Sequence, residues 1–324
     1  MPSIGKILFG SMPRTRSIAR AISRYESGKV SKEILDESYR SSLKRFLDLA
    51  FSYDFARVSD GMYRWDDLFN PLASYLGAEV NGLRRFYDNN FFYRQPVFRK
   101  KIEYDKAHIS TTLIEDLKIL KQEHRIQRLS ISLPGPLTLA RNSIIEKSVY
   151  SSHLDLARDY VEKVVLRELE TALREGVRNL DLHEPELGFE DLSEEYVNLY
   201  RRITDHMPGH IWIIVYFGYN PGNVRRLAEI SSEKNMIPVI DLISSSVSVE
   251  TFAEDARKSR EVGVGIVDSR NTKIEKLEYL RDLISNIEKN LRDTERIYVT
   301  HNTNLEFLPE RIAMRKIRLL GRVV

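Results

Sequence analysis

The sequence predicts an α/β protein built as a closed (β/α)₈ barrel, the TIM-barrel class of fold. Eight short apolar runs rich in β-branched residues recur along the chain, and amphipathic helical segments separate most of them. Polar or acidic residues follow nearly every run, as expected where the carboxyl ends of parallel strands form one mouth. A chain of 324 residues suits a single barrel with insertions. We therefore expect one domain over residues 1–324.

The expected strands are short, and several end in a turn signal. The first covers residues 6–9, and Gly10 after it permits a tight turn beside a ligand. The fifth, residues 212–218, is continuously apolar, which is typical of a parallel strand covered on both faces. Pro185 ends the fourth soon after His183, because proline cannot extend a strand ladder. The remaining strands are expected at residues 55–59, 129–133, 180–183, 236–243, 262–268 and 296–300.

Helical periodicity fills most of the gaps between these strands. A helix over residues 31–50 opens at Ser31, with Glu33 and Glu37 in its early turns, where acids favour the helix dipole. A long amphipathic helix over residues 155–175 leads into the fourth strand. The other helices are expected at residues 17–25, 110–122, 194–206, 224–234, 249–259 and 277–291.

An aromatic-rich insertion follows the second strand, at about residues 65–108. The hydrophobic residues there follow neither a helix nor a strand period, and five aromatic residues stand within residues 86–93. Such a cluster favours a buried lid or an interface over a ring-stacking ligand site, since aromatic side chains mostly supply packing area. The flanking Asp88, Asn89 and Asn90 keep the ligand interpretation open. We expect a hairpin near residues 98–104.

A doubly wound open sheet is the alternative architecture. The first strand lacks the G-x-G-x-x-G turn that a dinucleotide-binding fold of that kind would show. The closed barrel is therefore favoured.

Composition excludes several classes of function. The 50 Lys and Arg against 47 Asp and Glu leave a net charge of only +3, and no basic run interleaves with aromatics, so we expect no nucleic-acid partner. The absence of cysteine removes disulfides, thiol nucleophiles and thiolate metal sites together. No stretch approaches the ~20 apolar residues of a membrane span, and the first ten residues are too short an apolar run for a signal peptide. We expect a cytoplasmic protein without a membrane partner.

Polar residues that follow the strands are expected to converge on one small-molecule site at the barrel mouth. So many acids and amides at strand ends are hard to explain as solvation alone. The residues concerned are Ser11, Arg14, Asp60, Gly135, Thr138, His183, Glu184, Tyr216, Gly218, Asp241, Ser244, Asp268, Arg270, Asn271, His301, Asn302 and Asn304.

The catalytic candidates are Asp60, His183, Glu184 and His301. His183 and Glu184 fit an acid/base pair, two ligands of a zinc ion, or a polar plug that closes the barrel. Zinc needs at least three ligands, and His301 is the only plausible third. We therefore assign no metal ligands.

Charged residues elsewhere around the mouth have two interpretations each. Asp268 and Arg270 fit either a polar ligand site or an internal ion pair that ties two loops. Arg14, Arg16 and Arg20 fit either an anionic tail, such as polyglutamate or phosphate, or ordinary surface charge. Gly135 most simply permits a tight turn.

These motifs together resemble the cobalamin-independent methionine synthases. The opening turn of that family is similar to residues 9–14, and its W-F-D-T-N-Y-H-Y stretch is similar to residues 86–93. Residues 134–138 match G-P-x-T, and residues 181–187 match I-D-E-P-x-L with His183 in the Asp place. Residues 216–218, 267–271 and 304–309 complete the series in the same order.

The resemblance implies two (β/α)₈ barrels that transfer a methyl group from methyl-tetrahydrofolate polyglutamate to homocysteine. The catalytic barrel of the family binds zinc through a His, two Cys and a Glu. This chain has no Cys, and residues 216–218 stand where the family's H-x-C would lie. Ser244 or Ser245 takes the Glu position, and the last Cys aligns near Thr303. The thiolate zinc site that activates the homocysteine thiol is therefore absent.

The resemblance thus points to a freestanding counterpart of the N-terminal barrel that pairs with a separate zinc-bearing catalytic barrel. Zinc would then be supplied by that partner, with no cofactor bound here through Cys. The expected substrate is methyl-tetrahydrofolate polyglutamate or a similar methyl donor. The candidate substrate-binding residues are Ser11, Arg14, Arg16, Asn89, Thr138, Tyr216, Asp268, Arg270, Asn271 and Asn304.

Two other functions stay open. One is a self-sufficient methyltransferase or lyase that uses the His and carboxylate candidates. The other is a non-catalytic scaffold barrel, which predicts a mouth filled by its own side chains.

Overall fold

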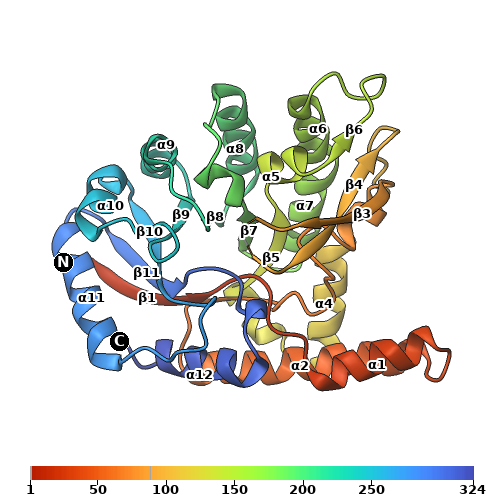
Figure 1. The fold of residues 1–324 in the computed structure, drawn as a ribbon, viewed down its shortest axis with the longest axis horizontal. Helices are drawn as coiled ribbons and strands as arrows, with labels where there is room; N and C mark the ends of the chain where they lie inside the picture. The colour runs from red at the N-terminus through yellow and green to blue at the C-terminus, as the bar shows by residue number, and fades with distance from the viewer. Residues whose placement is uncertain (1, 88) are drawn as a thin grey trace.

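The computed structural model describes residues 2–87 and 89–324, and it confirms the closed barrel (Figure 1). Eight parallel strands close in the order β1-β11-β10-β9-β8-β7-β5-β2. Strand β1 pairs with both β2 and β11, so the first strand of the chain closes the ring. The barrel strands are β1 (Ser3–Leu8), β2 (Arg57–Ser59), β5 (Leu129–Pro134), β7 (Asn179–His183), β8 (His210–Val215), β9 (Met236–Asp241), β10 (Glu261–Val267) and β11 (Arg296–His301).

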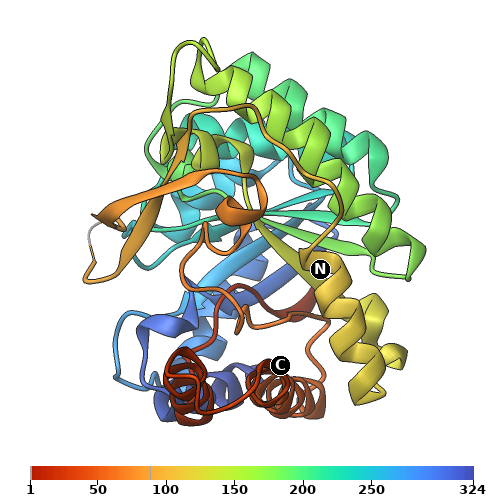
Figure 2. The ribbon, with the colours of Figure 1, turned by 90° about the vertical axis from the view of Figure 1, so that its right-hand side faces the viewer.

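Helices cover the outside of the barrel. The pair α1 and α2 lies together with α12 along one side, whereas α6, α8 and α9 stand at the other (Figure 1). Figure 2 shows this two-sided cover after a quarter turn. The bounds are α1 (Arg16–Glu26), α2 (Lys32–Ser52), α3 (Leu72–Tyr75), α4 (Ile109–Leu120), α5 (Pro136–Arg141), α6 (His153–Tyr160), α7 (Leu166–Arg174), α8 (Glu194–His206), α9 (Pro221–Glu233), α10 (Val249–Ala256), α11 (Leu277–Asn290) and α12 (Glu310–Leu320).

The expected helices are confirmed with small shifts at their ends, and three are additions. Helix α8 has the expected bounds, whereas the expected 155–175 helix divides into α6, a π-helical segment η2 (Val161–Val165) and α7. Sequence patterns predicted neither α3 nor α5, which have only four and six residues, nor α12. None of the described helices has the length and apolar composition needed to cross a bilayer.

The hairpin expected near residues 98–104 was misplaced. The insertion instead forms β3 (Glu79–Arg85) and β4 (Phe92–Phe98), which pair antiparallel, and β6 (Ile144–Ile145) adds a third strand beside β4. The aromatic stretch therefore forms the turn of the hairpin and the start of β4. Every residue of β3 is exposed, so this strand lacks the alternating pattern that marks a half-buried strand in sequence.

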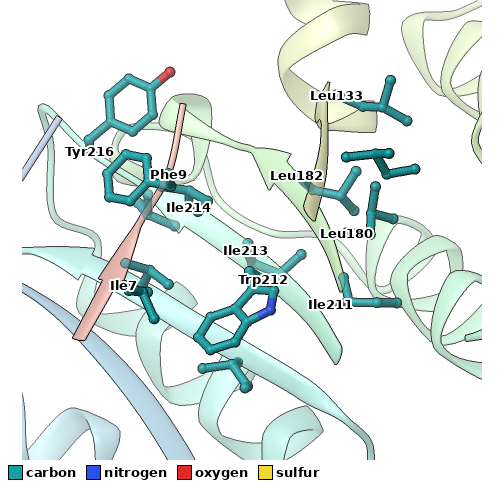
Figure 3. Close-up of a cluster of buried hydrophobic side chains, with 14 of the residues drawn as sticks. Ile7, Phe9, Leu133, Leu180, Leu182, Ile211, Trp212, Ile213, Ile214 and Tyr216 are labelled. Atoms are coloured by element: carbon teal, nitrogen blue, oxygen red, sulfur yellow. The ribbon is translucent and has the colours of Figure 1, made fainter. Parts of the chain in front are cut away.

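The alternation of the strands separates two packing layers. In Figure 3, Ile7, Phe9 and Tyr216 lie on one side of β8, and Leu133, Leu180 and Leu182 lie on the other. The first set faces the barrel axis, whereas the second packs under the helices. Burial of these apolar side chains is the main stabilisation of the fold.

A buried ion pair interrupts this apolar interior. The Arg57 guanidinium bonds the Asp181 carboxylate, and Ser130 Oγ bridges the two at 3.1 Å from Arg57 Nη1 and 3.0 Å from Asp181 Oδ2. The guanidinium also lies 4.2 Å from the centre of the Trp212 ring. The side chains of Arg57 and Asp181 are 2% and 0% exposed, so the charges are shielded from solvent. Their pairing therefore fixes β2, β5 and β7 against one another.

Candidate functional site

The mouth of the barrel collects most of the residues that the sequence singled out. Strand β7 ends at His183 and is followed by Glu184, and strand β11 ends at His301. Tyr216 follows β8. All four side chains are buried, with exposed fractions of 2% or less. The strand ends thus converge as expected, but beneath the surface and not in an open cleft.

Glu184 holds the N-terminus of a neighbouring helix. Its carboxylate accepts hydrogen bonds from Leu137 N at 3.0 Å, from Thr138 N at 2.8 Å and from the Thr138 hydroxyl at 2.6 Å. The Tyr200 hydroxyl donates a fourth at 2.5 Å. Helix α5 starts at Pro136 after Gly135, which has no side chain to cap it. Glu184, directly after β7, therefore caps the N-terminus of α5, where a carboxylate complements the helix dipole.

The protonation of Glu184 reflects two opposed effects. Burial raises the pKa of Glu184 to about 7, while the hydrogen bonds from Thr138 and Tyr200 favour the carboxylate and oppose that rise. All four groups that contact the carboxylate are hydrogen-bond donors, and an ionised carboxylate can accept a bond from each of them. The bonds to Glu184 therefore have a structural role, and Thr138 is engaged by Glu184 through both its backbone N–H and its hydroxyl.

His183 is buried without a hydrogen-bond partner on either ring nitrogen among the described residues. Its ring faces Phe9, with centroids 6.0 Å apart, and Tyr216, at 6.1 Å. Burial, together with the nearby charges of Arg57 and His301, lowers the pKa of His183 to about 3. The imidazole is therefore neutral at physiological pH, with one donor and one acceptor nitrogen.

His301, in contrast, uses both nitrogens. Nδ1 lies 2.6 Å from the carbonyl oxygen of Thr303, and Phe9 N donates to Nε2 at 3.4 Å. Burial lowers the pKa of His301 to about 4. The Phe9 ring lies tilted against the His301 ring, with centroids 4.2 Å apart, and also contacts the His183 ring. His301 thus packs β11 against β1.

Asp60 belongs to a different part of the molecule. It accepts a hydrogen bond from Met62 N at 3.0 Å and lines a cavity of about 330 Å³ between α2 and α4, whose wall includes Arg64 and Trp65. Burial raises the pKa of Asp60 to about 6. The four catalytic candidates therefore do not line one cavity.

These contacts test whether His183, Glu184 and His301 fit a zinc ion. Four donors engage the Glu184 carboxylate, and both nitrogens of His301 have protein partners. Only His183 has unengaged nitrogens, and a zinc site needs at least three ligands. In the described part of the chain, no group of three His, Asp or Glu side chains is placed to hold a metal ion. The residues do not fit the zinc site of the resembling family.

Aromatic side chains from the hairpin and from three mouth loops contact one another at the mouth. Tyr87 stacks on Phe189 with centroids 5.6 Å apart and lies 5.3 Å from Phe217. At the far end of the turn, Phe91 meets Phe307 at 4.6 Å. We call these five residues the aromatic lid. Because the three loop residues follow β7, β8 and β11, the turn of the insertion covers the carboxyl ends of those strands.

A hydrogen-bond chain fixes one side of the aromatic lid. The Tyr87 hydroxyl donates to Glu186 Oε1 at 2.9 Å, and Asn142 Nδ2 donates to the same oxygen at 2.7 Å. Tyr93 then donates to Asn142 Oδ1 at 3.0 Å. Burial and the negative charge of Glu186 raise the pKa of Tyr87 well above its usual value, so this hydroxyl stays a donor.

Phe217 stands at the centre of the aromatic lid with a φ of +73°. That left-handed conformation is unfavourable for an aromatic residue and persists only where the surroundings fix it. The Arg270 guanidinium lies 5.4 Å from the Phe217 ring. Backbone strain is therefore present in the aromatic lid, at Phe217.

The other substrate-binding candidates lie around the rim in distinct places. Arg14 donates to Trp65 O and Asp66 and lines a cavity of about 230 Å³ with Glu306. A second rim cavity, of about 350 Å³, is lined by Arg85, Asn89, Asn90, Phe91, Arg270 and Phe307. Arg16 is exposed at the start of α1. The rim therefore carries arginines next to two small cavities.

Several candidates instead fix the loops that shape the mouth. Asn304 Oδ1 accepts from Ser11 N at 3.2 Å, and a Cβ at Gly10, whose φ is +64°, would lie 1.9 Å from that oxygen. Asp268 accepts from Arg270 N at 2.8 Å, and Asn271 accepts from Lys273 N at 2.9 Å. Asp268 and Asn271 also line a larger groove of about 710 Å³ outside the aromatic lid.

Glu306 is an acid of the rim that sequence reasoning missed. Burial raises the pKa of Glu306 to about 7, the charge of Asp67 adds to the rise, and Arg14 opposes it. Glu306 lies within the motif at residues 304–309, but nothing in the local sequence marked it as a buried acid. Its environment comes from the loop after β2, which is distant in sequence.

Stability near neutral pH is expected to depend on Glu306. A raised pKa means that the folded state holds this proton more tightly, so the contribution is complete below about pH 4.5 and is lost as pH rises through about 7. Glu306→Gln should therefore flatten the fall in urea midpoint between pH 5 and pH 7.5 relative to wild type. Equal slopes for the two proteins would contradict the assignment.

Two buried residues of the barrel interior were also missed. Arg57 and Asp181 looked like ordinary strand residues, although Asp181 is the polar member of the Leu180–Leu182 alternation. That alternation was the available signal, because a central strand with helices outside it turns its alternate residues toward the barrel axis.

Comparisons with known proteins agree with the fold. The family described as "Cobalamin-independent synthase, N-terminal domain" matches residues 61–292. The "Methionine synthase" of Sulfurisphaera tokodaii is 27% identical over 98% of this chain and 90% of the relative. That of Sulfolobus acidocaldarius is 24% identical over 96% and 88%. The chain therefore spans most of the length of both relatives.

Two solved structures share the fold. A B12-independent methionine synthase from Shewanella sp. W3-18-1, in complex with selenomethionine, superposes with a TM-score of 0.76 at 18% identity, over 98% of this chain and 95% of that one. A putative vitamin-B12 independent methionine synthase from Listeria monocytogenes gives 0.66 at 18% identity, over 97% and 94%. At this identity the likeness shows the fold alone.

Proposed function

This chain belongs to the cobalamin-independent methionine synthase family through its N-terminal domain, and from that premise we propose a role as the donor-binding barrel. In this role it holds methyl-tetrahydrofolate polyglutamate and presents it to a separate barrel that carries zinc and homocysteine. The observation that carries the proposal is the state of the mouth: Glu184 is committed to capping α5, and the aromatic lid covers the strand ends.

The chemistry of methyl transfer explains why a partner is needed. Homocysteine reacts as a thiolate, and a metal ion lowers the pKa of such a thiol. This chain offers only His183 with unengaged nitrogens among the candidate ligands, and it contains no cysteine. Activation of the acceptor therefore falls to the partner, while this barrel binds and orients the donor.

The rim supplies groups that suit an anionic tail. Arg85 and Arg270 line one rim cavity, and Arg14 lines another beside Phe91, which also lines the first. Guanidinium groups bind carboxylates strongly and in fixed geometry. A polyglutamate tail would lie along this edge, with its carboxylates near the three arginines.

We expect the purified chain to bind methyl-tetrahydrofolate triglutamate without turning it over. Calorimetry should give tighter binding for the triglutamate than for the monoglutamate, and the difference should shrink in high salt because charge pairing is screened. With homocysteine and zinc present, methionine should form only after a zinc-bearing catalytic barrel is added. Methionine formation by this chain alone would refute the proposed division of labour.

Arg270→Ala tests the proposed binding site of the polyglutamate tail. It should weaken triglutamate binding roughly tenfold, about the value of one charged hydrogen bond. Arg257→Ala is the matched control, because Arg257 is an exposed arginine directly after α10 and pairs with Glu254 at 3.2 Å. Equal losses for the two variants would show that the tail binds elsewhere.

A non-catalytic scaffold is the second candidate function. It predicts a mouth filled by the protein's own side chains, and the contacts among Tyr87, Phe189 and Phe217 have that form. This function requires that neither folate form binds in the calorimetric experiment.

A further inference from the structure

Six polar atoms on the inner faces of strands β2, β5, β7 and β11 have no hydrogen-bond partner among the described residues. They are Nε and Nη2 of Arg57, the hydroxyls of Ser132 and Thr300, and both ring nitrogens of His183. None of these four side chains is more than 2% exposed. Buried polar groups in folded proteins are nearly always hydrogen-bonded, so a cluster of six requires an explanation.

Strand alternation places these atoms in the same interior. Asp181 points inward because it bonds Arg57 from across β5. Ser132 is its register partner on β5, and His183 follows two residues later on β7, so both share its face. Asp181, Ser132 and His183 therefore all face the barrel interior.

Thr300 completes the lining from the opposite wall. Tyr298 points inward, because its ring meets Trp212 with centroids 4.8 Å apart. Thr300 lies two residues farther along β11 and shares that face. Since β11 and β7 stand on opposite sides of the ring order, the orphaned atoms surround the barrel axis.

Arg57, on β2, has part of its guanidinium unengaged. Nη1 is satisfied by Asp181 and Ser130, but Nε and Nη2 are not. The charge of Arg57 also reaches both mouth histidines, because it contributes to the lowered pKa of His183 and of His301. The guanidinium also bonds Asp181, which lies two residues before His183 on the same face of β7, so it faces the same interior as that histidine.

We infer that the barrel interior binds a small cluster of ordered water molecules, which joins the free edge of Arg57 to Ser132, Thr300 and His183. A buried water makes about three hydrogen bonds, so six atoms require about two molecules. Water fits better than an anion, because the Arg57 charge is already paired with Asp181 and the other groups are neutral. The network lies below His183 and is separate from the proposed tail site on the rim.

A crystal structure at a resolution that shows ordered water is the direct test. Density peaks within hydrogen-bond distance of Arg57 Nε or Nη2 and of at least one hydroxyl are expected. An interior without peaks would overturn the inference. Crystals soaked in bromide show whether the site holds water or an anion. An anomalous peak at the same position would mean that an anion binds there, and it would also overturn the inference.

The sign of a stability change provides a second test in solution. If water bonds these hydroxyls, Ser132→Ala and Thr300→Val each remove a satisfied bond, and the unfolding constant should rise roughly fivefold. If the interior is dry, each variant removes an unsatisfied group and the unfolding constant should fall. Ser231→Ala calibrates the scale, since that buried hydroxyl donates to Glu261 O at 3.3 Å. Because both variants are smaller than or equal in size to wild type, each should fold.

Discussion

Gly135→Ala is expected to destabilise the protein by about 3 to 5 kcal/mol. A Cβ at Gly135 would lie 2.0 Å from Glu184 Cδ and 2.2 Å from Glu184 Oε1. The carboxylate would then have to leave the four donors that it binds at the start of α5. Denaturant unfolding of the variant measures the loss.

The backbone itself gives no reason for this cost, which makes the prediction specific. The φ of Gly135 is −71°, a value that alanine adopts freely. Gly82→Ala is the matched control, because nothing lies within 4 Å of a Cβ at that position. A similar small effect at both positions would show that Glu184 is free to move, and its capping role would be lost.

Asp181→Asn is expected to cost about 3 to 5 kcal/mol of folding free energy. The substitution leaves the Arg57 guanidinium buried against Trp212 without its counter-charge. Part of the cost comes from Ser130 Oγ, which donates to Asp181 Oδ2 at 3.0 Å. Urea unfolding, with intact far-ultraviolet circular dichroism as the check on fold, measures it.

Two controls separate charge burial from packing. The double variant Arg57→Met with Asp181→Leu removes both charges and should be much less harmful than Asp181→Asn alone. Glu229→Gln breaks an exposed pair with Lys258, whose side chain is 56% exposed, and should cost less than about 1 kcal/mol. If Asp181→Asn costs no more than Glu229→Gln, the interior pair contributes nothing to stability.

The predictable part of the fold rests on patterns that local physics imposes. The continuous apolar run at β8 and the alternation at β7 predicted strands, because strand side chains have a period of two. The length of the α8 pattern gave its bounds. Pro185 marked the end of β7, since it cannot donate to a ladder.

The hairpin of the insertion was misplaced because its pairing is not encoded in a local pattern. Strand β3 is exposed at every position, so hydrophobic periodicity gives no signal there. Its register against β4 shifts between Val80 and Leu83, which further disturbs the alternation. Tyr87 and Phe91 nevertheless contact rings of the loops that follow the barrel strands.

The sequence by itself determined the class of fold, the order of the strands along the chain and the absence of any thiolate. These follow from periodicity and composition, which each segment carries alone. Only the tertiary structure decided what the strand-end residues do. Glu184 became a helix cap because the first turn of α5, whose bonded N–H groups are 46 and 47 residues away in the chain, lies beside it. His183 became a buried neutral imidazole because distant strands surround it. The role of a polar side chain depends on which donors, charges and solvent reach it, and those neighbours come from segments that only the closed barrel brings together.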